Sequence, residues 1–137
     1  MAIDYWLQGR AGIDYPASLT DVDDLTDAFS RQLDNKATCM GRRTNALLPA
    51  IQDSRCVIGQ SSIGVRIGAL GFSAHVAGEC AVIGHTRALA CGLDSRAIRA
   101  NAFCPGWVFT VAAKRLLHAL VGSDSAEVVT VRQAVMA

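Results

Sequence analysis

Three short strand-like runs alternate along the chain with two longer helix-like segments, and this order limits the folds open to it. The runs 3–8 (IDYWLQ), 56–62 (CVIGQSS) and 98–106 (IRANAFCPG) have the length and the bounding turn residues of strands. Between them lie 18–33, with large apolar residues at helical spacing, and 72–92, which ends at a glycine. This alternation predicts parallel βαβ units with right-handed crossovers.

The segments around these elements are less regular. Ser18 or Thr20 is expected to cap the first helix, which we expect to continue towards 46–51 through a polar stretch of uncertain register. The run 64–71 holds three glycines and is predicted to be a loop, and 111–122 is predicted to be a further amphipathic helix.

The order of the elements also predicts how the sheet is covered. If the strands are laid down in one direction, right-handed crossovers place both crossover helices on the same face. A parallel sheet normally has both faces covered, and only the helix at 111–122 remains for the other face. The pattern therefore indicates that the cover of the second face is either missing or supplied by a second chain.

Composition excludes several classes of protein. The 137 residues fit one domain, 1–137, and 51% apolar with 18% charged residues is enough for a core. A net charge of +1 argues against nucleic-acid binding. No apolar run reaches the roughly 18 residues of a membrane span, and the N-terminus has no signal-like pattern, so a cytoplasmic protein is expected.

Five cysteines are spread along the chain without a CxxC spacing. Their odd number and spacing predict buried, reduced thiols rather than a disulfide framework or a zinc site.

The stretch 61–110, SSIGVRIGALGFSAHVAGECAVIGHTRALACGLDSRAIRANAFCPGWVFT, resembles the short-chain dehydrogenase/reductase family. In that family an active-site serine at the end of a strand is followed thirteen residues later by the tyrosine of Tyr-x-x-x-Lys. Here Ser62 stands thirteen residues before His75, and the motif reads His75-x-x-x-Glu79. The resemblance thus assigns Ser62, His75 and Glu79 to the catalytic positions.

The same resemblance extends to both sides of these residues. The turn PGWVFT is similar to the family's nicotinamide-side turn, which assigns cofactor contacts to Pro105, Gly106, Val108 and Thr110. Read structurally, this turn only ends a strand and starts a helix. The run IDYWLQGRAGI loosely resembles the strand that ends in Asn-Asn-Ala-Gly in the family, with Gly9 and Arg10 replacing the asparagines, and the family's helical asparagine falls near Gln32 or Asn35.

The resemblance implies a fold and a cofactor. The fold is α/β, a truncated Rossmann-like arrangement of two or three layers with a short parallel sheet, in effect the catalytic half of such an enzyme. The glycine-rich dinucleotide loop that opens the family's fold has no counterpart in this sequence. The implied cofactor is NAD or NADP, and the implied reaction interconverts an alcohol and a carbonyl.

The substitutions change the chemistry that the resemblance implies. Ser62 would polarise the substrate oxygen, and His75 would have to exchange the proton. Glu79 reverses the charge of the lysine, so the nicotinamide ribose loses its cationic anchor and a phenolate-like base loses its support. We expect oxidoreductase activity that is weak or absent.

Three other interpretations of this trio remain open. Ser62, His75 and Glu79 are the residue types of a hydrolase triad, although the Gly-x-Ser-x-Gly elbow is absent. A metal site on His75 and Glu79 would need a third ligand that the sequence does not identify, and no metal is predicted. In the structural interpretation, His75 and Glu79 form an exposed or half-buried polar pair on one helix face.

Family members commonly dimerise through the two helices that match 18–51 and 72–92. The resemblance therefore implies a homo-oligomer or a complex with a full-length relative. A non-catalytic association module is the alternative function, because these helices remain while the catalytic pair does not.

Overall fold

The computed structural model describes residues 3–8, 17, 19–68 and 71–106, together with five positions of the following segment, 108, 110, 111, 113 and 115. Its three strands are β1 (Ile3–Gln8), β2 (Ile51–Gln60) and β3 (Arg99–Phe103). They form one parallel sheet in the order β1-β2-β3. The predicted α/β class and the short parallel sheet are confirmed.

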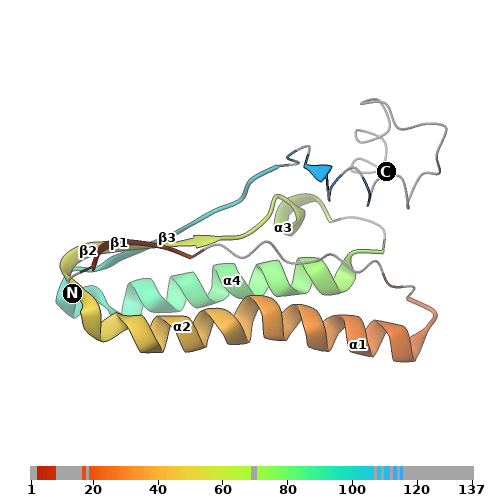
Figure 1. The fold of residues 1–137 in the computed structure, drawn as a ribbon, viewed down its shortest axis with the longest axis horizontal. Helices are drawn as coiled ribbons and strands as arrows, with labels where there is room; N and C mark the ends of the chain where they lie inside the picture. The colour runs from red at the N-terminus through yellow and green to blue at the C-terminus, as the bar shows by residue number, and fades with distance from the viewer. Residues whose placement is uncertain are drawn as a thin grey trace.

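The helices of the two crossovers form one layer on the same side of this sheet (Figure 1). The first crossover runs through α1 (Val22–Leu33), η1 (Asp34–Thr38), α2 (Cys39–Leu47) and the short η2 (Leu48–Ala50). The second is α4 (Ser73–Gly92) followed by η3 (Asp94–Arg96). In the described part of the chain the architecture thus has two layers, as right-handed crossovers between sequential strands require.

The N-cap of the first helix lies one residue after Thr20 and three residues after Ser18, the two predicted caps. Asp21 is the N-cap, and its Oδ1 accepts a hydrogen bond of 3.1 Å from the Asp24 backbone N–H, so the prediction of Ser18 or Thr20 is wrong. Asp23 and Asp24 lie in the first turn, where the helix dipole favours negative charge. The helix continues to Leu47, as expected.

The polar stretch within this helix is a π-helix, η1. A π turn closes i→i+5 hydrogen bonds and is rare outside single-turn bulges, which often lie at functional sites. It carries Lys36, which is buried.

The second strand begins earlier than predicted. β2 starts at Ile51 instead of Cys56 and ends at Gln60, before Ser61 and Ser62. After the buried Ile51, residues 52–54 are polar and exposed, and Ser54 has a φ of 63°. Across it the register with β1 shifts, because Ile3 pairs with Ile51 while Tyr5 pairs with Cys56. This bulge explains why hydrophobic patterning did not find the start of the strand.

The remaining predicted boundaries differ by a few residues. The predicted loop 64–71 contains a single helical turn, α3 (Gly64–Ile67), so a loop throughout is wrong. The helix predicted at 72–92 is α4, and the third strand is shorter than the predicted 98–106. Of the helix predicted at 111–122, residues 111, 113 and 115 are helical and the rest lies outside the described residues, as do Gly9 and Arg10.

The core has two apolar clusters with polar residues between them. One cluster joins the sheet to the end of α4 through Ile51, Val57, Leu93 and Ile98. The other joins α1 to the start of α4 through Ala17, Ala28 and Ala74. The polar side chains between the helices and under the sheet are buried: Gln32, Lys36, Thr44, Glu79 and Thr86.

The cysteines are all thiols in the structure. Cys56 is buried, as predicted, but Cys80 and Cys91 are exposed, so the prediction of buried thiols is wrong for these two. Both lie at exposed positions of α4.

Candidate functional site

The loops that follow β2 and β3 are hydrogen-bonded to each other. The Ser61 N–H donates to the Phe103 carbonyl at 2.9 Å, and the Ile63 N–H donates to the Pro105 carbonyl at 3.0 Å. These bonds bring Ser62 and the Pro105–Gly106 turn to the carboxyl ends of neighbouring parallel strands. Ligands of open α/β sheets bind at this edge.

Ser62 and His75 approach each other around one glycine. The Ser62 Oγ accepts a hydrogen bond of 3.2 Å from the Gly64 N–H. A Cβ on Gly64 would lie 3.5 Å from the Ser62 Oγ and 3.8 Å from the His75 Cδ2, so both side chains flank this residue. The structure therefore brings together the serine and the histidine that the sequence placed thirteen residues apart.

The imidazole of His75 sits in a largely closed setting on α4. Its side chain is 12% exposed, and the Phe72 ring meets it edge-on with ring centroids 6.0 Å apart. Its Nε2 lies 4.0 Å from the Glu79 Oε1, one helical turn away. At this distance His75 and Glu79 are neighbours on one helix face but are not hydrogen-bonded to each other.

Glu79 is buried and paired with a residue of the other crossover. Its exposed fraction is 3%, and the Lys36 Nζ donates to its Oε1 at 2.5 Å. Lys36 is itself only 8% exposed. The expectation of an exposed or half-buried pair is wrong for Glu79, because a buried carboxylate needs a compensating partner and Lys36 supplies it. The Glu79 Oε1 thus faces both an ammonium and an imidazole.

Two further contacts hold this carboxylate in place. The Ser61 Oγ donates to the Glu79 backbone carbonyl at 3.0 Å and ties the end of β2 to α4. Beside it, Gly78 permits a close crossing of the helices, because a Cβ there would lie 3.1 Å from the Lys36 Cγ and 3.3 Å from the Gln32 carbonyl oxygen. A side chain at position 78 would push Lys36 away from Glu79.

Lys36 is the residue that sequence reasoning missed. The charge reversal at Glu79 was a usable signal, because a carboxylate carried into a core needs a cation. The stretch 31–43 offers four cations, however, and hydrophobic spacing cannot choose among them. Of the two asparagine candidates, Gln32 is fully buried at the end of α1 and Asn35 is partly buried in η1.

The four residues assigned to the cofactor lie beyond β3. Pro105 is partly buried through the contact of its loop with Ile63, whereas Gly106 and Val108 are exposed. The Thr110 Oγ accepts a hydrogen bond of 3.1 Å from the Ala113 N–H, which is the geometry of a helix N-cap. This contact fits the structural interpretation of the turn, and the cofactor role stays a prediction.

The fit of a nicotinamide dinucleotide to these residues is uneven. Nothing lies within 4 Å of a Cβ built on Gly106, so the backbone there has room for a ligand. At the position that the resemblance assigns to ribose binding, however, Glu79 is buried and its Oε1 is taken by Lys36. These residues do not offer the cationic anchor for the nicotinamide ribose, so this part of the site does not fit the cofactor.

The described residues contain neither a candidate metal site nor a candidate membrane span. No group of three or more histidine, cysteine, aspartate or glutamate residues there could hold a metal ion. No helix in this part of the chain has the length and apolar character needed to cross a membrane.

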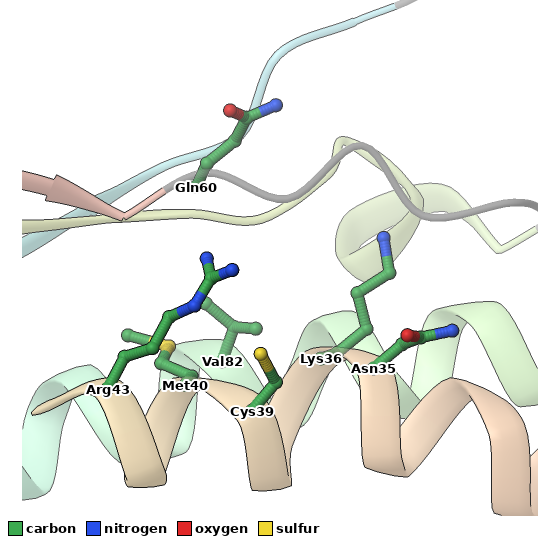
Figure 2. Close-up of a pocket in the computed structure, with 7 residues that line it drawn as sticks. All are labelled: Asn35, Lys36, Cys39, Met40, Arg43, Gln60 and Val82. Atoms are coloured by element: carbon green, nitrogen blue, oxygen red, sulfur yellow. The ribbon is translucent and has the colours of Figure 1, made fainter.

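A pocket opens beside Lys36, between the first crossover and the end of β2 (Figure 2). It encloses about 280 Å³, including space that is open to solvent. Its lining residues come from η1, α2, β2 and α4: Asn35, Lys36, Cys39, Met40, Arg43, Gln60 and Val82.

Comparison with known proteins gives sequence matches over most of the chain. The sequence profile of a family described as "Enoyl-(Acyl carrier protein) reductase" matches residues 5–135. Oxidoreductase UcpA of Escherichia coli strain K12 is 30% identical over 127 residues, which cover 90% of this chain and 48% of the relative. The chain therefore spans about half the length of the curated relatives that it matches.

Solved structures show the same fold. A short chain dehydrogenase family protein from Francisella tularensis superposes with a TM-score of 0.77 at 23% identity, over 87% of this chain and 48% of its own. Thermoplasma acidophilum aldohexose dehydrogenase, in ligand-free form, superposes with a TM-score of 0.76 at 23% identity, over 90% of this chain and 48% of its own. At this level of identity the likeness establishes the fold.

Proposed function

The chain belongs to the short-chain dehydrogenase/reductase family, and we propose that it carries an impaired form of the family's site for an alcohol/carbonyl pair. Hydride transfer with NAD or NADP is weak or absent in this chain. The observation that carries the proposal is the burial of Glu79 against Lys36 at the position where the family has a lysine.

The residues that remain support only part of the reaction. Ser62 stands at the carboxyl end of β2 with its Oγ near Gly64, where it would polarise a substrate oxygen. His75 flanks the same glycine and would exchange the proton. A positive charge would be needed to support this exchange and to bind a ribose. The position that should supply it is Glu79, a carboxylate, which pairs with the Lys36 ammonium. A proton donor and an oxygen ligand are thus left without their electrostatic support.

The test combines cofactor binding with turnover. NADH and NADPH are titrated into the purified chain by calorimetry, and oxidation of the cofactor is followed with a panel of small ketones and aldehydes. We expect cofactor-dependent turnover to be weak or absent. Wild-type turnover at a rate ordinary for enzymes, about 1 per second or more, that Ser62→Ala abolishes would contradict the proposal, because it would show an unimpaired site.

The structure also sets the design of the rescue variant. Restoring the family's pair with His75→Tyr and Glu79→Lys alone would bury two ammonium groups side by side at Lys36. The variant must therefore add Lys36→Glu, which keeps one buried ion pair with its charges exchanged. Cofactor-dependent turnover gained by this triple variant would show that the charge reversal is the impairment.

A second function, association without catalysis, is favoured by the outer face of α4. Residues of small volume are exposed there at helical spacing, including Cys80, Gly84 and Ala88. Gly84 has nothing within 4 Å of a built Cβ, so another helix could approach it closely. We propose that α4 and the first crossover pair with a second copy or with a full-length relative.

This pairing is tested by the mass of the chain in solution, measured by light scattering after gel filtration. Ala88→Glu places a charge on the exposed face of α4, and Ser95→Glu makes the same change on exposed η3 as a control. We expect a dimer for the wild type and Ser95→Glu, and a monomer for Ala88→Glu. A monomeric wild type would contradict the proposal.

A further inference from the structure

The pocket beside Lys36 has a one-sided charge. Its lining includes two cations, Lys36 and Arg43, and the side-chain amides of Asn35 and Gln60, but no aspartate or glutamate from the described residues. Figure 2 shows the guanidinium of Arg43 and the thiol of Cys39 extending from the helix towards the β2 side, where Gln60 lies. Donors of hydrogen bonds and positive charge therefore surround this space.

The Lys36 ammonium has hydrogen-bonding capacity to spare. An ammonium carries three N–H donors, and in the described part of the chain one of them is used, by the Glu79 Oε1. Because Lys36 is only 8% exposed, water satisfies the others poorly. A buried polar group in this condition favours a further acceptor. The pocket that Lys36 lines is where such an acceptor would lie.

We propose that this pocket binds a small oxyanion, a phosphate or a short carboxylate, between Arg43 and Lys36. Arg43 presents a fork of donors that matches two oxygens of such a group, and the Lys36 ammonium adds a second positive charge. Met40 and Val82 give the pocket an apolar side that suits the short chain of a carboxylate. Because part of its roughly 280 Å³ is open to solvent, the pocket would hold such a group at its mouth, partly exposed to water.

The pocket shares Lys36 with the Lys36–Glu79 pair described above, but it does not include the serine and histidine of that site. Ser62 and His75 are not among the residues that line it. The proposal therefore holds or fails independently of oxidoreductase activity, and its test needs no turnover.

Cys39 provides a reporter within the pocket itself. The full chain is alkylated with limiting iodoacetate or iodoacetamide, and modification of each cysteine is quantified by mass spectrometry of peptides. Cys80 and Cys91, both exposed, serve as internal references. Relative to them, we expect Cys39 to favour the anionic reagent over the neutral one by about two- to five-fold, the size of a surface charge interaction.

Ligand binding is read as protection of Cys39. Inorganic phosphate and butyrate are added separately at constant ionic strength, so that screening does not change. At about ten times its dissociation constant, a ligand should slow the alkylation of Cys39 by roughly ten-fold and leave Cys80 unchanged. Protection by phosphate alone identifies a phosphate site, and protection by butyrate alone identifies a carboxylate site.

Two adjacent arginines give a matched pair of variants. Arg42 and Arg43 are both exposed, but only Arg43 lines the pocket, so Arg43→Gln and Arg42→Gln change the net charge equally. We expect Arg43→Gln to remove the protection and the preference for iodoacetate, and Arg42→Gln to keep both. The proposal is overturned if neither ligand protects wild-type Cys39 up to about 10 mM. It is also overturned if the two variants behave alike.

Discussion

Removing one partner of the Lys36–Glu79 pair should cost far more stability than removing both. Lys36→Met leaves the Glu79 carboxylate buried at 3% exposure without its cation, and Glu79→Gln leaves the ammonium without its anion. Breaking a buried pair in this way typically costs about 3–5 kcal/mol. In a chain of this length that loss lowers the melting temperature by roughly 10–20 °C.

The double variant should be more stable than either single one. Lys36→Met with Glu79→Gln leaves no buried charge, only an amide with incomplete hydrogen bonding, at a cost of about 1–2 kcal/mol. The double-mutant cycle should therefore give a coupling energy of at least about 4 kcal/mol. Urea denaturation followed by circular dichroism measures all four free energies of unfolding.

An exposed ion pair on α1 is the control. Arg31 and Asp27 stand one turn apart with an N–O distance of 2.7 Å, and their side chains are 55% and 58% exposed. Arg31→Met should cost less than about 0.5 kcal/mol. If Lys36→Met costs as little as Arg31→Met, Lys36 is not buried against Glu79 in solution and the reasoning above is refuted.

Two further predictions concern the packing around these helices. Gly78→Ala should lower the free energy of unfolding by about 1–3 kcal/mol, because its Cβ would lie 3.1–3.3 Å from atoms of the first crossover. Gly84 lies in the same helix, but a Cβ built there meets nothing within 4 Å among the described residues. Gly84→Ala should therefore raise the free energy of unfolding by up to about 1 kcal/mol. Opposite effects of the two in urea denaturation check this, and equal effects would contradict it. Arg96→Ala should lower the free energy of unfolding by about 1–3 kcal/mol, because Arg96 donates to two backbone carbonyls at the η2–β2 junction. Asp53→Asn removes only the exposed ion pair of Asp53 with Arg96, so it should change the free energy of unfolding by no more than about 0.5 kcal/mol.

The order of the elements was predictable because it depends on local patterns. Apolar runs of strand length marked all three strands, and right-handed crossovers fixed both helices on one face. The start of β2 was not predictable, because the residues directly after Ile51 are polar and lie at an irregularity in the pairing with β1, which hydrophobicity does not report. The exposure of Cys80 and Cys91 escaped for a related reason, since cysteine is usually buried whichever helix face it occupies.

The candidate site was predictable in its members but not in its connections. The spacing of Ser62 and His75 placed both residues at one edge of the sheet, where the structure has them around Gly64. The partner of Glu79 lies 43 residues away on a helix whose register is set by a π turn. No pattern within a helix specifies a contact between helices, so Lys36 could be identified only in three dimensions.

The π turn has a consequence for the phase of the long first crossover. Its buried positions recur at every fourth residue: Ala28, Gln32, Lys36, Met40 and Thr44. In an uninterrupted α-helix, at about 100° per residue, the first and last of these would point about 160° apart. One π turn adds roughly one residue to the helix and sets the phase back by about 100°, which leaves them about 60° apart. Deleting one residue in η1 would restore a regular α-helix without rotating its second half, because about fifteen residues at about 100° each also leave the ends about 60° apart. A change that regularised the turn while keeping every residue would instead rotate the second half by about 100° and turn Met40 and Thr44 away from the interior.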